Sequence, residues 1–279
     1  MNPVRKITNG LYRLKIRHKL GYCRIWCQSK LYPPPPKGKF MPVWMAAKRP
    51  WGLLAVGGTL TENTLLEAYS QGIYSMYQKH PVQWFSCNPR MVLFPEKMRI
   101  EKDWRKLVRS GRYRVTFDTA FEEVVRRCGN RKWTWLIPER IDAAIALHKR
   151  GQAHSVEVWN REGILVGGGF GVDMGKVFIG ESAFSTERNV VHVAFIHLMC
   201  HLQHWGYVLN DAQAYSEHLH LMGFEEIPRK EYVQKLQELA GTDIRYGKWV
   251  VDRRLAVGEW VPSKPGSQLN NSASGQGRS

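Results

Sequence analysis

Apolar residues recur along the chain with two different periods, which predict a mixture of helices and strands. Spacings of three and four residues, flanked by capping residues, predict helices, whereas short runs rich in β-branched and aromatic residues predict strands. Helices are expected at residues 61–71, 101–109, 119–128, 139–150, 188–205, 215–222 and 229–240. Strands are expected at residues 83–85, 91–94, 112–116, 154–159, 163–172, 176–182 and 207–210. The chain is therefore predicted to have an α+β fold.

The predicted elements fall into several segments. They are a basic arm at 1–50, a small N-terminal α+β domain at 51–100, a larger domain at 101–245, a C-terminal segment at 246–262 and a disordered tail at 263–279. After its first helix, the larger domain has the order β-α-α-β-β-β-α-β-α, which is that of the GCN5-related N-acetyltransferase (GNAT) fold. We therefore expect a GNAT-like mixed sheet. Order alone says little about activity, because one fold hosts many functions.

Size and composition favour a soluble globular protein. The 279 residues are enough for a sizeable core, and a hydrophobic fraction of 43% is typical of globular chains. No apolar run approaches the ~20 residues that span a bilayer, so no membrane segment is expected. The five cysteines are scattered, which favours a reducing, cytoplasmic setting. Cys23 and Cys27 lack a second ligand pair at zinc spacing and are expected to be thiols.

Positive charge is distributed unevenly along the chain, whose formal net charge is +17. Residues 1–50 contain twelve Lys and Arg and no acid, and residues 90–132 contain thirteen bases and six acids. Residues 133–262 are slightly acidic, with thirteen bases and sixteen acids. A basic face beside a mildly acidic half predicts a polyanionic partner together with a site that favours cationic groups.

The basic arm has three interpretations, and all stay open. Its bases are interspersed with aromatic residues and are followed by four prolines at 33–36, which predict a stiff spacer. The arm suits RNA binding, an organelle transit peptide, or a misassigned start codon. Its single serine, Ser29, and single threonine, Thr8, argue weakly against transit.

Two carboxylates and an amide follow predicted strands of the larger domain. Glu181 lies near the end of one strand, and Asp211 and Gln213 follow another. If these strands are neighbours, the three side chains meet at one edge of the sheet. Burying a carboxylate is costly unless it is paired or used. The carboxylates either have a structural role, capping a turn or pairing with a nearby base, or they bind and orient a cationic amine. An α-amine has a pKa near 8, so a hydrogen-bonding carboxylate is sufficient to help it react.

The glycines at 167–169 and 171 do not have the context of a phosphate-binding loop. They lie inside predicted strands rather than between a strand and a helix, which predicts close backbone approach instead. An acetyl-CoA enzyme of this fold should have a glycine-rich turn before the long helix. Here residues 185–189 read STERN, without glycine. This difference argues against coenzyme A.

Three histidines share one predicted helix. His197, His201 and His204 are spaced by four and three residues, which is metal-ligand spacing. The zinc-protease pattern requires Glu after the first His, and Leu198 stands there. Because the neighbouring residues are apolar, we expect buried histidines that pack between helix and sheet, and no metal site.

Ordered motifs between residues 50 and 240 resemble the leucyl/phenylalanyl-tRNA–protein transferase family. The motifs are GLLAVGG at 52–58, GIY at 72–74, WFS at 84–86, NPR at 88–90, VLFP at 92–95, TW at 134–135, PE at 138–139, HSVEVW at 154–159, GES at 180–182, FS at 184–185, DAQ at 211–213, EHL at 217–219 and IPR at 227–229. Members of the family move an amino acid from aminoacyl-tRNA to the N-terminus of a protein that begins with Arg or Lys. The resemblance implies a GNAT-like C-terminal domain, a small N-terminal domain, and no metal or nucleotide cofactor.

The resemblance also implies roles for individual residues. Asp211 and Gln213 match the pair that positions the attacking α-amine, and Glu181 matches an acidic residue near the aminoacyl group and the amine. Trp84 and Trp135 match aromatic residues that line the cleft for the terminal adenosine, where stacking on the base would contribute ~1–3 kcal/mol. Residues implied to line or flank the pocket for the transferred side chain are Phe178, Gly169, Phe170 and Ser182.

Several positions depart from the family pattern. Ala212 stands where the family usually has Cys, which fits a mechanism without an acyl thioester. Gly169 stands where a bulky pocket residue is usual, so we expect a roomier pocket that tolerates larger aromatic side chains. Thr186 and His192 replace basic residues, and Met76 replaces Trp. These departures bear on substrate specificity more than on chemistry.

We therefore predict a cytoplasmic, monomeric aminoacyltransferase that needs no cofactor. It would join Leu, Phe or a similar apolar amino acid to proteins with N-terminal Arg or Lys, tagging them for degradation. Its expected partners are the acceptor stem and 3′ end of aminoacyl-tRNA and the acceptor protein. An acetyl-CoA-dependent amine acetyltransferase and a non-catalytic tRNA-binding module are the alternatives. Contacts with RNA phosphates are expected from Arg90, Arg105, Lys106, Arg109, Arg126, Arg127, Arg131 and Lys132.

Overall fold

The computed structural model describes residues 30–35, 39–48, 52–76, 81–131, 134–242 and 244–264. Most of the basic arm, with Cys23 and Cys27, lies outside these residues, as do nearly all of the C-terminal tail and Lys132. Expectations for those segments stay predictions.

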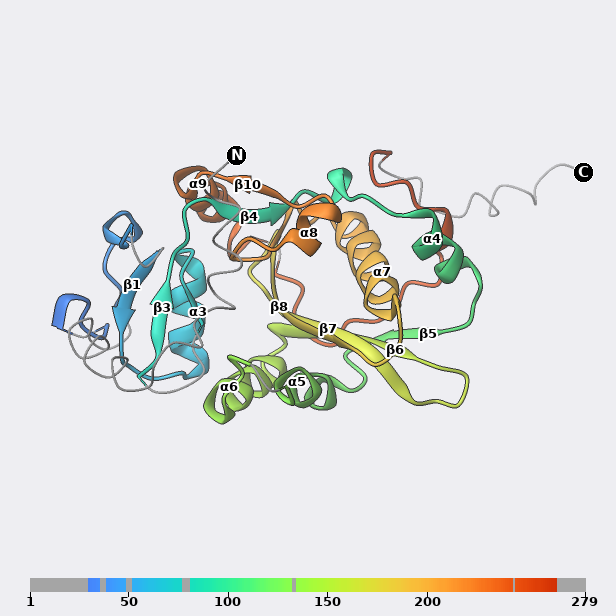
Figure 1. Ribbon diagram of the computed structural model, residues 1–279, viewed down its shortest axis with the longest axis horizontal. Coiled ribbons are helices and arrows are strands. Elements are labelled where there is room, and N and C mark those ends of the chain that lie inside the picture. Colours follow the sequence, from blue (N-terminus) through green and yellow to red (C-terminus); the bar gives the residue numbers. More distant parts are fainter. Residues whose placement is uncertain are drawn as a thin grey trace, which may run out of the picture.

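A small antiparallel sheet forms one end of the molecule (Figure 1). Its strands are β1 (Leu53–Val56), β2 (Tyr74–Ser75) and β3 (Gln83–Phe85), in the order β1-β3-β2. Helix α3 (Glu62–Ser70) begins where predicted, because the Thr61 hydroxyl caps it by accepting the Thr64 N–H at 3.2 Å. Gly72 ends it with a positive φ of 74°.

A larger mixed sheet forms the body of the molecule. Its strands follow the order β10-β4-β9-β8-β7-β6-β5, and only β8 and β9 pair in parallel. The strands are β4 (Arg90–Leu93), β5 (Arg114–Phe117), β6 (Ala153–Trp159), β7 (Leu165–Asp173), β8 (Val177–Ser185), β9 (Leu209–Asp211) and β10 (Glu225–Ile227). The element order from β5 to α8 is the one predicted, which confirms the α+β class with a GNAT-like sheet.

Four strands differ from expectation. β1, β2 and β10 were not predicted, because each has only two to four residues, and two of the three residues of β10 are glutamates. β4, which was grouped with the small domain, pairs with β9 and β10 in the larger sheet. The small sheet is therefore built from residues 53–85, whereas the predicted domain boundary at residue 100 stays a prediction.

Helices cover both faces of the larger sheet (Figure 1). On one face α5 (Phe121–Gly129) packs on β7 and β8 while α6 (Pro138–Lys149) packs on β6; on the other, α7 (Val190–His204) packs on β6 and β7. Glycines of β7 allow the helix α7 and the side chains of the neighbouring strand β8 to approach its backbone closely. A Cβ on Gly167 would lie 2.5 Å from the Val190 side chain, and one on Gly171 would lie 2.5 Å from the Phe178 ring. The glycine run is therefore structural, as its position inside a strand predicted.

The remaining helices frame this body. They are α4 (Lys102–Arg109), α8 (Glu217–Leu221) and α9 (Arg229–Leu239), and short 3₁₀ turns occur at Val43–Met45, Pro95–Lys97 and Val257–Glu259. Among the described residues, none of the helices is both long and apolar enough to cross a membrane.

The C-terminal segment is part of the core on the α7 side. Trp249 is 1% exposed and Trp260 is fully buried. Arg105 of α4 donates to the carbonyl oxygens of Gly258 and Trp260 at 3.0 and 2.8 Å. The backbone N–H of Asp252 donates to Nε2 of the buried His201 at 3.0 Å. These contacts fix the segment to both α4 and α7.

His201 makes the attachment of this segment sensitive to pH. Burial lowers its pKa from 6.5 to about 4, and its Nε2 must stay unprotonated to accept the Asp252 N–H. Because the unfolded chain then binds the proton more readily than the folded chain, this stabilisation is complete above about pH 6.5 and is lost as the pH falls toward 4. We expect His201 to contribute about 2–3 kcal/mol to the fall in the free energy of unfolding over this range.

Urea unfolding of the wild type and of His201→Gln, at a series of pH values from 7 to 4, measures this contribution. The variant cannot take up the proton and should show the flatter dependence. His220→Gln, on the exposed face of α8, is the matched control and should keep the wild-type slope. Equal slopes for wild type and His201→Gln would contradict the assignment.

Candidate active site

Glu181 and Asp211 lie on neighbouring strands, as the sequence predicted. β8 and β9 pair in parallel, with Ile179 opposite Asp211. Glu181 is the extra residue of a β-bulge, because its neighbours Gly180 and Ser182 pair with consecutive residues of β7. A bulge re-aims a side chain next to a functional site. Here the Glu181 side chain meets residues from α3, α6 and the segment after β9.

Asp211 is fully buried and fully paired. Arg90 of β4 donates through Nε to Oδ1 at 2.8 Å and through Nη2 to Oδ2 at 2.6 Å. Tyr232 of α9 donates its hydroxyl to Oδ2 at 2.7 Å. The third guanidinium nitrogen, Nη1 of Arg90, donates to the Gly72 carbonyl oxygen at 3.3 Å. This closed arrangement holds Asp211 in one orientation.

Glu181 is also held by an arginine and a tyrosine, but its arginine does not use all of its donors. Arg140 of α6 donates through Nη2 to Oε2 at 2.6 Å, and Tyr69 of α3 donates its hydroxyl to Oε1 at 2.5 Å. Arg140 Nη2 also contacts the Tyr69 hydroxyl. The Nε and Nη1 atoms of Arg140 are buried and have no hydrogen-bond partner.

Gln213 bridges the two carboxylates. Its backbone N–H donates to Asp211 Oδ1 at 2.8 Å, and its Nε2 donates to Glu181 Oε1 at 3.0 Å. The residue has a φ of 66°, a left-handed conformation that costs energy for a residue with a side chain. Because Nε2 points to Glu181, the amide oxygen Oε1 is left as a fixed acceptor with no hydrogen bond to the described residues. That oxygen is suited to bind an N–H group of a substrate.

Burial and neighbouring charges fix the protonation of this network. Burial and then the negative charge of Asp211 raise the pKa of Tyr232 well above 10. Burial likewise raises the pKa of Tyr69 above 10, against the opposing effect of Arg140. For Arg90, burial lowers the pKa, but the charge and hydrogen bonds of Asp211 together with the neighbouring Tyr232 and Tyr74 raise it by more. Both tyrosines therefore remain donors and the arginines remain charged at neutral pH.

The alternative reading, that each carboxylate pairs with a base, is confirmed by the two buried ion pairs. Pairing is compatible with function, because Gln213 keeps a free acceptor between them. The partners Tyr69, Arg140 and Tyr232 were not predicted. The burial of Arg140 could have been inferred from the sequence. Arg140 precedes Ala143, Ala144 and Leu147 by three, four and seven residues, which places it on the same buried face of α6.

The two tryptophans that were predicted to line the adenosine cleft are buried or partly buried. Trp84 is fully buried, donates its indole N–H to the Gly57 carbonyl oxygen at 2.8 Å, and meets the Phe40 ring edge-on at 4.9 Å. Trp135 is partly buried against the same core. Stacking of adenine on Trp84 is therefore incompatible with this arrangement, whereas the role of Trp135 stays a prediction.

The predicted pocket residues lie on different faces of the sheet. Phe178 packs on the α7 side, 5.7 Å from the Trp249 ring, whereas Phe170 packs on the α5 side against Phe121. Gly169 is buried beside Ala183 of β8, which is exposed, and a Cβ on Gly169 would lie 3.0 Å from the Ala183 Cβ. Gly169 thus borders a surface that opens to solvent. Ser182 is half-buried in β8 beside Glu181.

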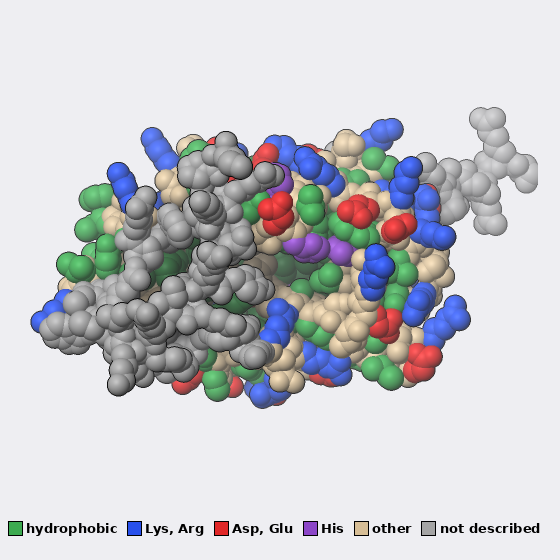
Figure 2. Space-filling view, in the orientation of Figure 1, with side chains coloured by type: hydrophobic (Ala, Val, Ile, Leu, Met, Phe, Trp, Pro, Cys, Tyr) green, Lys and Arg blue, Asp and Glu red, His purple; other side chains and the backbone are tan. Residues whose placement is uncertain are grey.

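Most of the predicted RNA-binding bases already have protein partners. Arg90 is buried on Asp211 and cannot reach a phosphate. Arg105 and Arg109 bind the C-terminal segment, Arg126 and Arg127 pair with glutamates of their own helix, and Arg131 contacts the Ala183 carbonyl oxygen. Figure 2 shows Lys and Arg side chains interspersed with Asp and Glu over the α4 end of the visible face. Of the predicted bases within the described residues, Lys106 is the one that is exposed and makes no hydrogen bond or ion pair with the protein.

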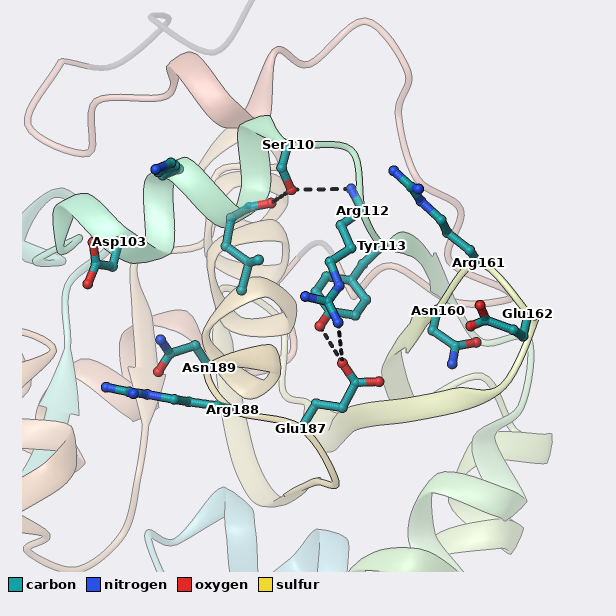
Figure 3. A pocket seen from close by; sticks show the side chains of 12 residues that line it. Asp103, Ser110, Arg112, Tyr113, Asn160, Arg161, Glu162, Glu187, Arg188 and Asn189 are labelled. Carbon is teal, nitrogen blue, oxygen red and sulfur yellow. Dashed lines mark hydrogen bonds and ion pairs between the residues drawn. The ribbon is translucent and has the colours of Figure 1, made fainter.

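A cavity of about 810 Å³ lies beside Lys106 (Figure 3). It lies between α4, the turn between β6 and β7, and the connection from β8 to α7. Arg112 and Tyr113 both point to Glu187, at 3.4 and 2.5 Å. The exposed arginines Arg161 and Arg188 complete its basic lining. This cavity follows the end of β8, beyond Glu181.

Two histidines of the helix α7 are buried. Burial lowers the pKa of His197 to about 3 and that of His201 to about 4, and the His201 Nδ1 lies 2.7 Å from the His197 carbonyl oxygen. In the part of the chain that the structure describes, no group of three potential metal ligands occurs. His197 and His201 are therefore packed and neutral at pH 7.

Comparison with known proteins identifies similar chains. A family model described as leucyl/phenylalanyl-tRNA protein transferase matches residues 92–237. A leucyl/phenylalanyl-tRNA–protein transferase of Nitrosospira multiformis is 43% identical over 218 residues, covering 76% of this chain and 94% of the relative. One of Pseudomonas syringae pv. tomato is 43% identical over 202 residues, covering 71% and 88%.

Among solved structures, a GCN5-related N-acetyltransferase from Kribbella flavida matches with a TM-score of 0.32 and 11% identity. It covers 57% of this chain and 58% of the other. A score this low supports no argument about function.

The pairing of Asp211 with Arg90 generates a prediction about stability. Asp211→Ala leaves the Arg90 guanidinium buried without its counter-ion, so the free energy of unfolding should fall by about 3–5 kcal/mol. Urea unfolding at pH 7 measures the loss. Glu225→Ala breaks the exposed Lys97–Glu225 pair and is the control, with an expected loss below about 1 kcal/mol. Similar small losses for both variants would show that the buried pair is not essential.

Proposed function

Because the chain belongs to the leucyl/phenylalanyl-tRNA–protein transferase family, a family of aminoacyltransferases, we propose that it transfers an amino acid from aminoacyl-tRNA to the α-amino group of a protein. The observation that supports this most is the free amide oxygen of Gln213, held between two buried carboxylates. It is a preorganised acceptor for one N–H of an amine nucleophile.

The proposed reaction is aminolysis of an ester. The α-amine attacks the carbonyl carbon of the aminoacyl ester, the C–N bond forms, and the C–O bond to the tRNA ribose breaks. The amine loses a proton and the departing ribose oxygen gains one. An ester is already activated, so catalysis consists mainly of orientation and charge stabilisation. Gln213 Oε1 orients the amine, and Asp211 acts as a positioning residue that holds Gln213 through its backbone N–H.

The finer features of the substrates are also proposed from the family. The transferred residue would be Leu, Phe or a similar apolar amino acid, with its side chain near Gly169 and the exposed Ala183. The acceptors would include proteins that begin with Arg or Lys, which the transfer would tag for degradation. The scattered cysteines support a reducing, cytoplasmic setting for this reaction.

The tRNA would bind along the cavity beyond the end of β8. Ser185, four residues past Glu181, is about 13 Å away along an extended strand. Phosphates of the acceptor stem can therefore meet Lys106, Arg161 and Arg188 while the 3′ end enters the amine site. This face replaces the one expected from Arg105 and Arg109, which bind the C-terminal segment instead.

The connection from β8 to α7 disfavours the alternative function, an acetyl-CoA-dependent acetyltransferase. A coenzyme A diphosphate would approach the start of α7, where the connection has no glycine and Glu187 presents a carboxylate held by Tyr113. Incubation with labelled leucyl-tRNA, phenylalanyl-tRNA or acetyl-CoA, together with a protein beginning with Arg, separates the alternatives. We expect label in the protein from an aminoacyl-tRNA only. Label from acetyl-CoA, or from neither donor, would contradict the proposal.

Substitution of Gln213 tests the amine site. Gln213→Ala removes the acceptor Oε1, and we expect transfer to fall by about 10²-fold or more while tRNA affinity is unchanged. Single-turnover transfer and filter binding measure the two effects separately. Full activity in Gln213→Ala would exclude the proposed role.

Charge reversal tests the tRNA face. The double variant Lys106→Glu, Arg188→Glu should bind tRNA more weakly, and the slope of log affinity against log salt should decrease by about 2. Lys149→Glu, at the end of α6, is the control and should keep the wild-type slope. An unchanged slope in the double variant would place the tRNA on another face.

A further inference from the structure

Strand β8 has an unpaired edge beside the amine site. Its pairing with β9 ends where Ile179 lies opposite Asp211. Among the described residues, no strand pairs with residues 180–185 on that edge, whereas β7 runs along the other. Gln213 crosses the gap to bind Glu181. In the proposed reaction the aminoacyl ester lies along this edge, because it must join the amine site to the tRNA face beyond the end of β8.

The α7 side of the sheet is open beside this edge. A Cβ on Gly167 would meet Val190 of α7, and Gly169 faces the same side because side chains alternate along a strand. Ala183 of β8 pairs with Gly169 and so also faces α7. Ala183 is exposed, whereas Phe184, which faces α5, is 9% exposed and belongs to the core. The transferred side chain therefore has room on the α7 side, over Gly169 and Ala183.

A buried amide carbonyl lies at one end of this space. Asn210 of β9 is the neighbour of Phe178 in β8 and faces α7 as that ring does, with its Nδ2 donating to Met199 Sδ at 3.2 Å. Its Oδ1 is directed at Gly180, because a Cβ on that glycine would lie 3.3 Å from it. Asn210 is 2% exposed, and its Oδ1 accepts no hydrogen bond from the described residues. The carbonyl is therefore an acceptor without a donor.

The space between Ala183 and this amide is long enough for a large aromatic side chain. Gly171 pairs with Gly180 and lies two residues from Gly169, so the two ends are about 7 Å apart along the strands. Gly180 has no side chain and is half-buried, which leaves the surface of β8 open between them. The Phe178 ring covers Gly171 and bounds the space on the β7 side. An indole side chain can span this distance, whereas the isobutyl side chain of leucine cannot.

An apolar space with one unpaired acceptor favours a side chain that carries an N–H group. A buried acceptor without a donor is costly, so a ligand that supplies the donor binds better than one of the same shape without it. Tryptophan is large and mostly apolar, and its indole nitrogen is a donor only. It therefore matches both the length of the space and the acceptor at its end. Leucine and phenylalanine enter the same space but leave Oδ1 of Asn210 unpaired.

We propose that Asn210 is a specificity-determining residue whose Oδ1 accepts a hydrogen bond from the indole N–H of a transferred tryptophan. The chain then transfers tryptophan as well as the smaller apolar amino acids. This inference rests on the proposed aminoacyl transfer. A purely structural Asn210, which only holds α7 through Met199, predicts something different, because side chains of equal shape with and without the N–H group would then react alike.

The test varies only the amino acid on one tRNA. A leucine tRNA is acylated chemically with Leu, Phe, Trp or benzothienylalanine, in which sulfur replaces the indole N–H group. Transfer to a peptide that begins with Arg is measured as kcat/KM. For the wild type, Trp should react within about tenfold of Phe. Benzothienylalanine should react about fivefold or more slowly than Trp, because it leaves the acceptor unpaired.

Three variants assign the effect to the amide and to the space. Asn210→Leu removes the acceptor at similar size, so the ratio of Trp to benzothienylalanine should fall to about one. Asn63→Leu, on the exposed face of α3, is the matched control and should keep the wild-type ratio. Ala183→Met fills the space from an exposed position and should slow Trp at least about fivefold more than Leu. If Asn210→Leu does not fold, as judged by thermal unfolding, the wild-type comparison and Ala183→Met still test the proposal.

The possible failures can be told apart. Equal kcat/KM for Trp and benzothienylalanine in the wild type, or an unchanged ratio in Asn210→Leu, would overturn the role of Asn210. Transfer of Leu and Phe without Trp would overturn the assignment of tryptophan as a substrate. Failure of the wild type to transfer any of the four amino acids would instead overturn the proposed function itself.

Discussion

The site depends on the burial of two carboxylates with two arginines. Such charges are stable inside a protein only when each has its partner and its hydrogen bonds. Here the partners come from α3, β4, α6, β8, β9 and α9, so elements distant in the chain must all be in place before the network closes. Its rigidity then fixes Gln213 in a left-handed conformation with its amide oxygen free. Preorganised groups of this kind stabilise a reaction without reorganising during it.

The same network joins the small N-terminal sheet to the larger one. Tyr69 of α3 reaches Glu181 of β8, and Arg90 of β4 reaches the carbonyl oxygen of Gly72 as well as Asp211. The amine site is therefore built by both parts of the chain. A larger sheet alone would lack the Tyr69 donor, and Glu181 would keep only Arg140 and Gln213 as hydrogen-bond partners.

The sequence predicted well what depends on local pattern. Periodicity located the helices, Thr61 and Gly72 marked the ends of one of them, and two strands brought Glu181 and Asp211 together. Contacts between residues far apart in the sequence could not be predicted from local pattern. Arg140 and Glu181 are 41 residues apart, and Arg90 and Asp211 are 121 apart. No short-range rule assigns such partners, so the two buried ion pairs emerged only from the fold.

The central claim is that the network presents an acceptor for a free α-amine, which is tested most directly by locating the bond that the protein makes. An acceptor protein with a free N-terminus, and the same protein with an acetylated N-terminus, are incubated with leucyl- and phenylalanyl-tRNA and analysed by tandem mass spectrometry. The account predicts one added residue on the α-amine of the free protein and none on the blocked one. Addition to lysine side chains, or equal addition to both proteins, would contradict it.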